Sequence, residues 1–338
     1  MSVKEKLTTL ADSIRAKTGT TDLLTLDQMN EKVNSIPDPI EGSYIEETYD
    51  TSGNLISAKL VGHDFVRNYL FYNCSKLALT SLPSGLTSIG NYAFSGCSNL
   101  ALTSLPSGVT SIGNYAFQRC FNLTLTSLPS SLISIGNYAF DYCSKLALTS
   151  LPSGVTSIGD SAFSSCSNLT LTSLPSGLTS ISNYAFNLCS KLALTSLPSG
   201  LTSIGNYAFS GCSNLALTSL PSGITLMGDG AFQSCNNLTL TSLPSSLTSI
   251  SSSAFFLCNN LTLLNLHSGI TSIGNVAFGS CSNLKTITFE GTPTSISANS
   301  FNACVNLTTI NVPWAEGEIA NAPWGATNAT INYNYTGE

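Results

Sequence analysis

Charged residues are scarce in this chain. They make up 9% of its 338 residues, and 12 basic and 18 acidic side chains leave a net charge of −6. Five of the basic residues lie between Tyr69 and Pro313. Nucleic-acid binding needs a basic face that neutralises phosphates, and a polybasic membrane patch needs the same. The composition therefore predicts no nucleic-acid partner and argues against electrostatic binding to a membrane.

Histidine is rarer still, and the groups that enzymes use are isolated. His63 and His267 are the two histidines, and they lie in different segments; His267 takes the place of a turn proline. No histidine or lysine recurs beside the many serines and threonines to activate one as a nucleophile. Paired carboxylates, a Cys-x-x-Cys zinc pattern and a phosphate loop are missing as well. The sequence predicts a protein that is not an enzyme and uses no cofactor or metal.

Long apolar runs are also missing. No stretch of 18 apolar residues could span a membrane, so membrane insertion is not expected. The segment from Met1 to Arg15 lacks the apolar core of a signal peptide. As written, the chain is expected to be virion-associated or cytoplasmic, and it would be a cell-surface or extracellular protein if a leader had been removed.

What the chain does contain is an unbroken period, marked by its cysteines. The 11 cysteines fall at positions 74, 97, 120, 143, 166, 189, 212, 235, 258, 281 and 304, and the interval between them never changes. Each has phenylalanine three residues before it and leucine three residues after it, as Cys97 has Phe94 and Leu100. Free cysteine packs as a small buried apolar side chain, and equivalent side chains in a stack point in parallel, which suits bridging poorly. This predicts a ladder of reduced, buried cysteines.

One unit, such as the segment from Cys97 to Arg119, buries too little apolar surface to fold alone, so the units are expected to stack into a parallel β solenoid. We predict in each unit a strand three to eight residues after the cysteine, a short second strand such as Val109–Ile112 and a single helical turn such as Asn114–Phe117. The first strand reads Leu-x-Leu-x-x-Leu in Leu100–Leu105 but Leu-x-x-Ile-x-Phe in Leu284–Phe289. This drift predicts a local difference in bulge or twist.

The two ends do not follow the period. Residues 1–37 are predicted to form a small helical hairpin, and a homo-oligomer could form through residues 3–36. The remaining segments are interpreted as a linker (38–48), a β-hairpin with a degenerate first repeat (49–73), the leucine-rich repeats (74–312) and a C-terminal cap (313–338). In the cap, Trp314 and Trp324 are expected to cover the open core, and a tryptophan-lined ligand site is the alternative.

The unit that begins Cys97-Ser-Asn-Leu and continues Leu-Pro-Ser-Gly-Val-Thr-Ser-Ile-Gly-Asn-Tyr-Ala-Phe resembles the BspA-like class of bacterial leucine-rich repeat. The resemblance covers about residues 63–312. It implies a right-handed parallel stack of leucine-rich repeats and, in cell-surface members, adhesion to host proteins or other cells. The ends, Ala11–Gly19 and the segment around Trp314, are similar to prophage-encoded tail-associated proteins of Firmicutes, which implies a virion part.

Residues that differ between units are the candidates for specific binding. The two positions before each cysteine vary most, and phenylalanine replaces the usual serine after one cysteine. The candidate binding residues are Arg119, Phe121, Tyr142, Leu188, Phe256 and Leu257. Large exposed side chains gathered in a patch mark an interface, and drift on a tolerant edge is the other interpretation. We expect a recognition or adhesion protein that binds a cell-surface protein or glycan through its solenoid surface. The alternative is a structural spacer that oligomerises through the N-terminal helices.

Overall fold

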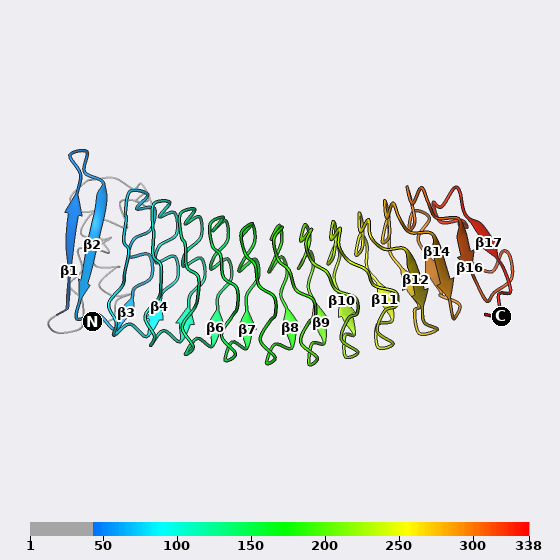
Figure 1. The fold of residues 1–338 in the computed structure, drawn as a ribbon, viewed down its shortest axis with the longest axis horizontal. Coiled ribbons are helices and arrows are strands. Elements are labelled where there is room, and N and C mark those ends of the chain that lie inside the picture. Colours follow the sequence, from blue (N-terminus) through cyan, green and yellow to red (C-terminus); the bar gives the residue numbers. More distant parts are fainter. Residues whose placement is uncertain (1–42, 338) are drawn as a thin grey trace, which may run out of the picture.

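The computed structural model describes residues 43–337, which form a parallel solenoid preceded by an antiparallel hairpin (Figure 1). The hairpin pairs β1 (Tyr44–Tyr49) with β2 (Leu55–Val61). A hairpin was expected here, but β1 starts at Tyr44, so part of the segment interpreted as a linker is a strand. The acidic composition of that segment is more typical of a linker than of a strand. A strand accommodates it here because Glu46 and Glu47 lie on its exposed surface. The helical hairpin predicted for residues 1–37 lies outside the described residues.

One side of the solenoid is lined by eleven two-residue strands, most of them paired in parallel with the equivalent strand of the next turn. They are β3 (Phe65–Val66), β4 (Ser88–Ile89), β5 (Ser111–Ile112), β6 (Ser134–Ile135), β7 (Ser157–Ile158), β8 (Ser180–Ile181), β9 (Ser203–Ile204), β10 (Leu226–Met227), β11 (Ser249–Ile250), β13 (Ser272–Ile273) and β15 (Ser295–Ile296). In most of them the isoleucine is buried and the serine is not. The predicted short second strand is therefore confirmed.

A second side forms strands only near the C-terminus of the described chain. These are β12 (Leu263–Leu266), β14 (Thr286–Phe289), β16 (Thr309–Asn311) and β17 (Thr330–Asn332), which pair in parallel in that order. The strand predicted here for every unit is wrong for the early turns. At the positions equivalent to β14, the buried leucines of an early turn lie three residues apart, as Leu102 and Leu105 do, whereas an extended strand puts residues two apart on one face. Ile287 and Phe289 keep that spacing of two, and β14 forms.

The segment between each short strand and the next cysteine is a series of tight turns. The helical turn predicted there is wrong, and residues 43–337 contain no helix. Tyr92 has a φ of 56°, a left-handed conformation that interrupts a right-handed helix. Its N–H donates to the carbonyl of Asn114 in the next turn of the solenoid at 2.8 Å. Phe94 donates to Ala116 in the same way. Hydrogen bonds between turns thus alternate with bonds within a turn that span three residues, such as that from the N–H of Ser95 to the carbonyl of Tyr92 at 3.2 Å.

Two ladders of identical side chains run through the core, among buried leucine, isoleucine and alanine side chains. Eleven phenylalanine rings, from Phe71 to Phe301, stack with centroids 5.3–5.7 Å apart. Beside them the cysteines are free, and all but Cys74 are buried. Each buried thiol donates to the carbonyl of a phenylalanine in an earlier turn, as Cys120 does to Phe94 at 3.1 Å. The predicted ladder of reduced, buried cysteines is confirmed.

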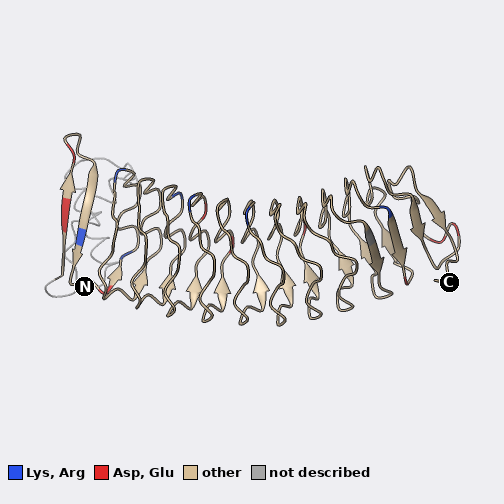
Figure 2. Cartoon of the chain, viewed as in Figure 1, with Lys and Arg blue, Asp and Glu red and all other residues tan. Residues whose placement is uncertain are grey.

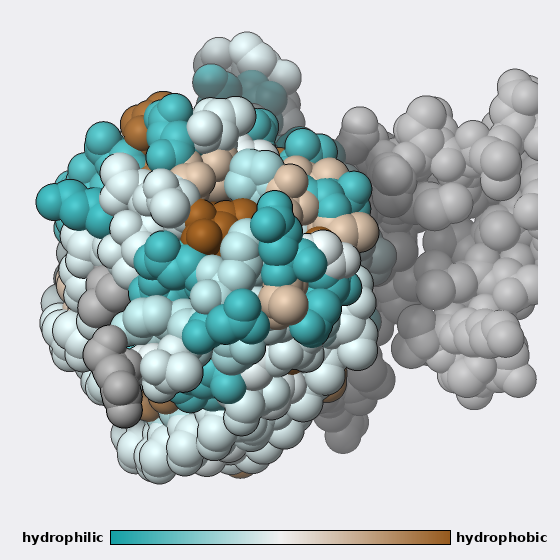
Figure 3. All heavy atoms as spheres, turned by 90° about the vertical axis from the view of Figure 1, so that its right-hand side faces the viewer, coloured by the Kyte–Doolittle hydropathy of each residue, from teal (hydrophilic) through white to brown (hydrophobic). Residues whose placement is uncertain are grey.

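Aromatic side chains close the C-terminal end of the core. Trp324 packs edge-on against Phe301 and donates its indole N–H to the carbonyl of Ala320 at 2.8 Å. Trp314 packs edge-on against Phe289. Both indoles are buried, and the end face in Figure 3 is largely hydrophilic around a small hydrophobic area. Buried indoles offer no surface to a ligand, so these tryptophans cover the core as expected.

Candidate functional site

The turns beside the cysteines form one long edge of the solenoid, and the candidate binding residues lie on it. The residue before the cysteine has a positive φ in every turn from Asn73 (58°) to Ala303 (57°). Two turns place glycine there, Gly96 and Gly211. Glycine adopts this conformation freely, whereas other residues lose roughly 1–2 kcal/mol. A bulky residue at this position therefore costs stability that glycine would not.

Four of the six candidates are exposed on consecutive or nearby turns. Phe121, Tyr142 and Leu188 expose 43%, 48% and 52% of their surface, and Arg119 is also exposed. Arg119, Tyr142 and Leu188 all have the positive φ, at 57°, 59° and 58°. The N–H of Arg119 donates to the carbonyl of Asp141 at 2.8 Å, which places Arg119 in the turn next to that of Tyr142. The structure thus brings Arg119, Phe121 and Tyr142 together, with Leu188 two turns further on.

The other two candidates lie apart. Phe256 and Leu257 are half-buried, and Leu257 is three turns beyond Leu188 in the stack. The ring of Phe256 packs over the backbone of Gly279, where an added Cβ would lie 3.0 Å from the ring. This phenylalanine therefore serves packing between turns, and the structure does not place it with the other candidates.

Two lysines on the same edge escaped the analysis of the sequence. Lys145 donates to the side-chain oxygen of Asn122, and Lys191 to that of Asn168, both at 2.7 Å. Each lysine stands two residues after a cysteine, where most turns carry asparagine. A comparison of that slot between units would have found them. We call Arg119, Phe121, Tyr142, Lys145, Leu188 and Lys191 the edge patch.

A buried carboxylate lies beneath the edge patch. Asp141 is 5% exposed, and its Oδ2 accepts a hydrogen bond from Nε2 of Gln118 at 3.1 Å. Burial raises the pKa of Asp141, while hydrogen bonds from Gln118 and Ser164 and the charge of Arg119 act in the opposite direction. The carboxylate links neighbouring turns, and Arg119 is the cation of the edge patch whose charge acts on it.

A row of tyrosines runs along the same turns. Four rings stack with centroids 4.5–4.7 Å apart, those of Tyr69, Tyr92, Tyr115 and Tyr138. Ser161 interrupts the row, which resumes with Tyr184 and Tyr207 at 5.1 Å. Because stacked rings cover one another's faces, the row leaves mainly ring edges for a ligand and strengthens the contact between turns.

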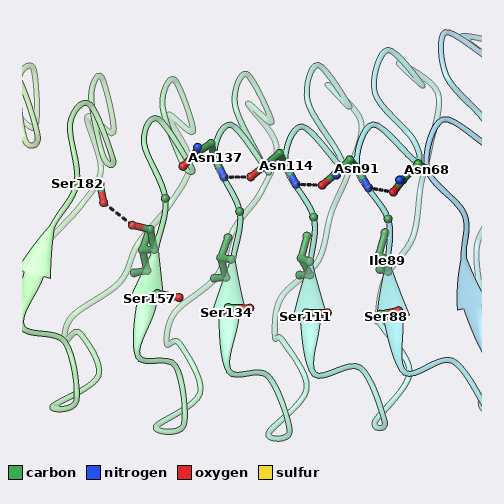
Figure 4. A pocket seen from close by; sticks show the side chains of 17 residues that line it. Asn68, Ser88, Ile89, Asn91, Ser111, Asn114, Ser134, Asn137, Ser157 and Ser182 are labelled. Carbon is green, nitrogen blue, oxygen red and sulfur yellow. Dashed lines mark hydrogen bonds between the residues drawn. The ribbon is translucent and has the colours of Figure 1, made fainter.

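A shallow groove of about 600 Å³ runs over β4 to β7 on the short-strand side (Figure 4). Repeated serine, isoleucine, glycine and asparagine residues line it. The side-chain oxygen of Asn91 accepts the N–H of Asn114 at 2.7 Å, and Asn114 accepts that of Asn137 at 2.8 Å. These oxygens are occupied in joining turns, so the groove belongs to the scaffold.

The repeats match a known family. Residues 64–193 and 202–322 fit a family model described as a BspA type leucine rich repeat region, in six copies. The chain belongs to this BspA-type leucine-rich repeat family. No match was found among curated proteins.

Solved structures resemble this BspA-type chain over most of its length. A leucine-rich repeat protein from Bacteroides ovatus is 22% identical, with a TM-score of 0.52 over 88% of this chain and 100% of that one. A leucine rich cell surface protein from Faecalibacterium prausnitzii is also 22% identical, with a TM-score of 0.50 over 89% and 96%. At such identities the likeness shows the fold. None of these matches supports the resemblance of the chain ends to tail-associated proteins.

BspA-type repeats offer an extended surface of the kind that solenoid proteins use for binding. Within residues 43–337, no three His, Cys, Asp or Glu side chains are grouped so as to hold a metal ion. His267 accepts the N–H of Gly269 through Nδ1 at 3.1 Å, in the turn role expected for it. The described part of the chain also contains no helix long and apolar enough to cross a membrane.

Proposed function

We propose that this protein is a non-enzymatic recognition protein that binds a protein or a glycan on a cell surface through the edge patch. The observation that carries the proposal is the positive φ of Arg119, Tyr142 and Leu188. Glycine would fold at these positions with less strain, as Gly96 and Gly211 do. Leu188 packs over Gly211 of the next turn, where an added Cβ would lie 2.8 Å from its Cδ2, so packing accounts for part of its size. For Arg119 and Tyr142, which are exposed, we propose contact with a partner as the reason for a large side chain.

The chemistry of the edge patch supports the same proposal. Phe121 and Tyr142 are exposed in adjoining turns, and exposed apolar groups that cluster on a soluble protein mark interaction sites. Tyrosine, tryptophan and arginine are the residues that most often carry binding energy at interfaces. One structural relative is a leucine rich cell surface protein, and we propose a cell-surface or extracellular location for this chain also.

The test compares the full chain with a variant in which the patch carries the residues of the other turns. This consensus variant is Arg119→Gly, Phe121→Ser, Tyr142→Gly and Leu188→Gly. The matched control removes two exposed apolar groups on the short-strand side, Ile133→Thr and Leu226→Ser. The unchanged chain, the consensus variant and the control are applied to arrays of bacterial-surface proteins, host matrix proteins and glycans.

We expect the unchanged chain and the control to bind at least one class of ligand, and the consensus variant to bind it at least tenfold more weakly. The proposal fails if the unchanged chain binds nothing above a scrambled-repeat protein. It also fails if the consensus variant binds as well as the unchanged chain.

The uniform stack favours a second function, that of a structural spacer. The register advances by one repeat unit at each paired short strand from β3 to β15, which makes a regular rod. A spacer would assemble through residues 3–36, and the length of the solenoid would set the distance between the parts that it joins. Tail genes beside the gene of this protein would support a place in a virion. If light scattering finds monomers both for the full chain and for a chain that starts at residue 43, the spacer function is wrong.

A further inference from the structure

The positive charges of the repeats are gathered on one edge. Between Tyr69 and Pro313 the chain has five basic residues, and each lies within four residues of a cysteine. They are Lys76, Arg119, Lys145, Lys191 and Lys285. Figure 2 shows most of the blue segments of the solenoid along its upper edge, away from the short strands. A chain with a net charge of −6 thus presents a line of cations on the edge that carries the edge patch.

The carboxylates of the repeats form no ion pair with these cations in the described part of the chain. Asp141 is buried and bonded to Gln118. Asp160 and Asp229 accept backbone N–H groups of the next turn in the asparagine ladder, at 3.0 and 3.1 Å. These three acids are therefore engaged within the scaffold, and the fourth acid of the repeats, Glu290, is exposed four turns beyond Lys191.

No ion pair involves the edge patch in the part of the chain that the structure describes. The pair found there joins Lys59 to Glu46 in the β1–β2 hairpin, at 3.2 Å. Arg119, Lys145 and Lys191 consequently have no carboxylate within 4.0 Å. Unpaired cations at one edge favour a ligand that brings the negative charges.

The two lysines are held in place by amide side chains. Lys145 is bonded to Asn122 and Lys191 to Asn168, while Asn168 also donates to the carbonyl of Ser144 at 2.8 Å. An ammonium group has three donors, so each lysine keeps two for a ligand. Lys145 and Lys191 are two turns apart, roughly 10 Å at the spacing of parallel strands. This distance is comparable to one disaccharide along a polysaccharide chain.

Two exposed aromatic rings belong to the same turns as these cations. Phe121 and Tyr142 expose 43% and 48% of their surface, and they stand in adjoining turns between Arg119 and Lys145 in the sequence. They do not line the groove over β4 to β7. An exposed ring on an open edge suits the flat face of a sugar, whereas acidic peptides are typically recognised by clusters of arginines, and the edge patch contains one arginine, Arg119.

We infer that the edge patch binds an anionic polysaccharide that lies along the solenoid. Its acidic groups contact Arg119, Lys145 and Lys191, and its sugar rings stack on Phe121 and Tyr142. This inference rests on the proposed function and names the class of its ligand. Carboxylated and sulfated polysaccharides share the required chemistry, because both are regular chains of sugars that carry acidic groups.

The test uses the full chain and two immobilised probes, polygalacturonate for carboxylates and chondroitin sulfate for carboxylates with sulfates. The charge variant is Arg119→Gln, Lys145→Gln and Lys191→Gln. The matched control removes two cations of the same edge outside the patch, Lys76→Gln and Lys285→Gln. Dextran, poly-L-glutamate and poly-dT serve as neutral, peptide and nucleic-acid comparisons.

We expect at least one of the two polysaccharides to bind, with binding at least tenfold weaker for the charge variant and nearly unchanged for the control. Binding should also weaken as salt rises, because salt screens charges beyond roughly 10 Å. The polysaccharide that binds more tightly identifies the acidic group of the ligand, carboxylate alone or carboxylate with sulfate. Equal binding by the charge variant, or tighter binding to dextran, poly-L-glutamate or poly-dT, would overturn the inference.

The inference and the proposed function can fail separately. If the arrays reveal a protein or neutral glycan whose binding depends on the edge patch, while neither polysaccharide binds, the inference is wrong and the proposed function stands. If the consensus variant matches the unchanged chain on every ligand, the proposed function is wrong as well.

Discussion

The hydroxyl of Ser182 donates to the carbonyl of Ile158 at 2.7 Å. One turn earlier, the equivalent carbonyl of Ile135 accepts a backbone N–H instead, from Gly159 at 2.9 Å. A side chain is hard to place in this slot, because a Cβ on the equivalent Gly205 would lie 2.6 Å from the backbone nitrogen of Asn183. The turn of Ser182 therefore separates from the turn of Ile158. The hydroxyl of Ser182 takes the place of the backbone N–H as the donor to the carbonyl of Ile158.

The same exchange occurs once more along the chain. Ser251 donates its hydroxyl to the carbonyl of Met227 at 2.6 Å. Within residues 43–337 the short strands fall into three sheets, with breaks between β7 and β8 and between β10 and β11. These breaks are the places where Ser182 and Ser251 replace glycine. The solenoid thus has two seams at which neighbouring turns share fewer backbone hydrogen bonds.

We predict that single substitutions in this slot will create or close a seam. Gly205→Ser should separate β8 from β9, lower the free energy of unfolding by about 1–3 kcal/mol through lost hydrogen bonds, and speed amide exchange in residues 202–205. Ser182→Gly should slow exchange in residues 179–182. Hydrogen exchange with urea denaturation measures both effects.

Ser297 supplies the control for this prediction. Its turn keeps β15 paired with β13, and its N–H donates to the carbonyl of Ile273 at 3.0 Å. Ser297→Gly should therefore leave the exchange of the neighbouring strand amides unchanged. Equal protection gained by Ser182→Gly and Ser297→Gly would show that the serine hydroxyl does not mark a seam.

A second prediction separates the two kinds of phenylalanine. Phe186 is fully buried in the ladder of rings, so Phe186→Ala should cost about 3–5 kcal/mol through lost burial and a cavity. Phe121→Ala removes the same atoms from an exposed ring and should change stability by less than about 0.5 kcal/mol. Urea denaturation of both variants tests the contrast, and similar costs would contradict the assignment of Phe121 to the surface.

The period of the sequence predicted which residues fill the core but not the path of the backbone. Repetition shows that Phe94, Cys97 and Leu100 are equivalent to their counterparts in the other units, and all three are buried. It does not reveal a left-handed conformation at Tyr92, because tyrosine is no signal for positive φ. Variation between units marks the exposed candidates, whereas the lysines stand out only when charge is compared slot by slot and not over the whole span of repeats.

The cysteine ladder predicts a loss of stability in alkali. Burial raises the pKa of the thiols from Cys97 to Cys258 above the ordinary value of 9.0. Below about pH 9 the thiols are protonated in both states, so this contribution is fully present. As the pH rises further, the unfolded chain loses protons that the folded chain keeps, and the free energy of unfolding should fall.

Urea denaturation between about pH 7 and pH 10 tests this dependence, and Cys120→Ala with Cys143→Ala should make the decline shallower. A thiol reagent should react slowly with the native protein at neutral pH and rapidly in urea. A free energy of unfolding that stays constant up to pH 10 would contradict the buried, protonated state of the ladder.

The edge patch predicts a conflict between stability and binding. At Tyr142, with a φ of 59°, glycine removes strain of roughly 1–2 kcal/mol and loses about 0.5–1 kcal/mol through its greater freedom in the unfolded chain. Tyr142→Gly should therefore be as stable as the unchanged chain or up to about 1.5 kcal/mol more stable. Its binding to any ligand of the edge patch should nevertheless weaken at least tenfold.

Thr103→Gly is the control, because Thr103 is exposed and is not among the residues with a positive φ. This substitution should lower stability and leave binding unchanged. A marked loss of stability in Tyr142→Gly would mean that the tyrosine serves the fold, and the argument for a binding role would lose its basis.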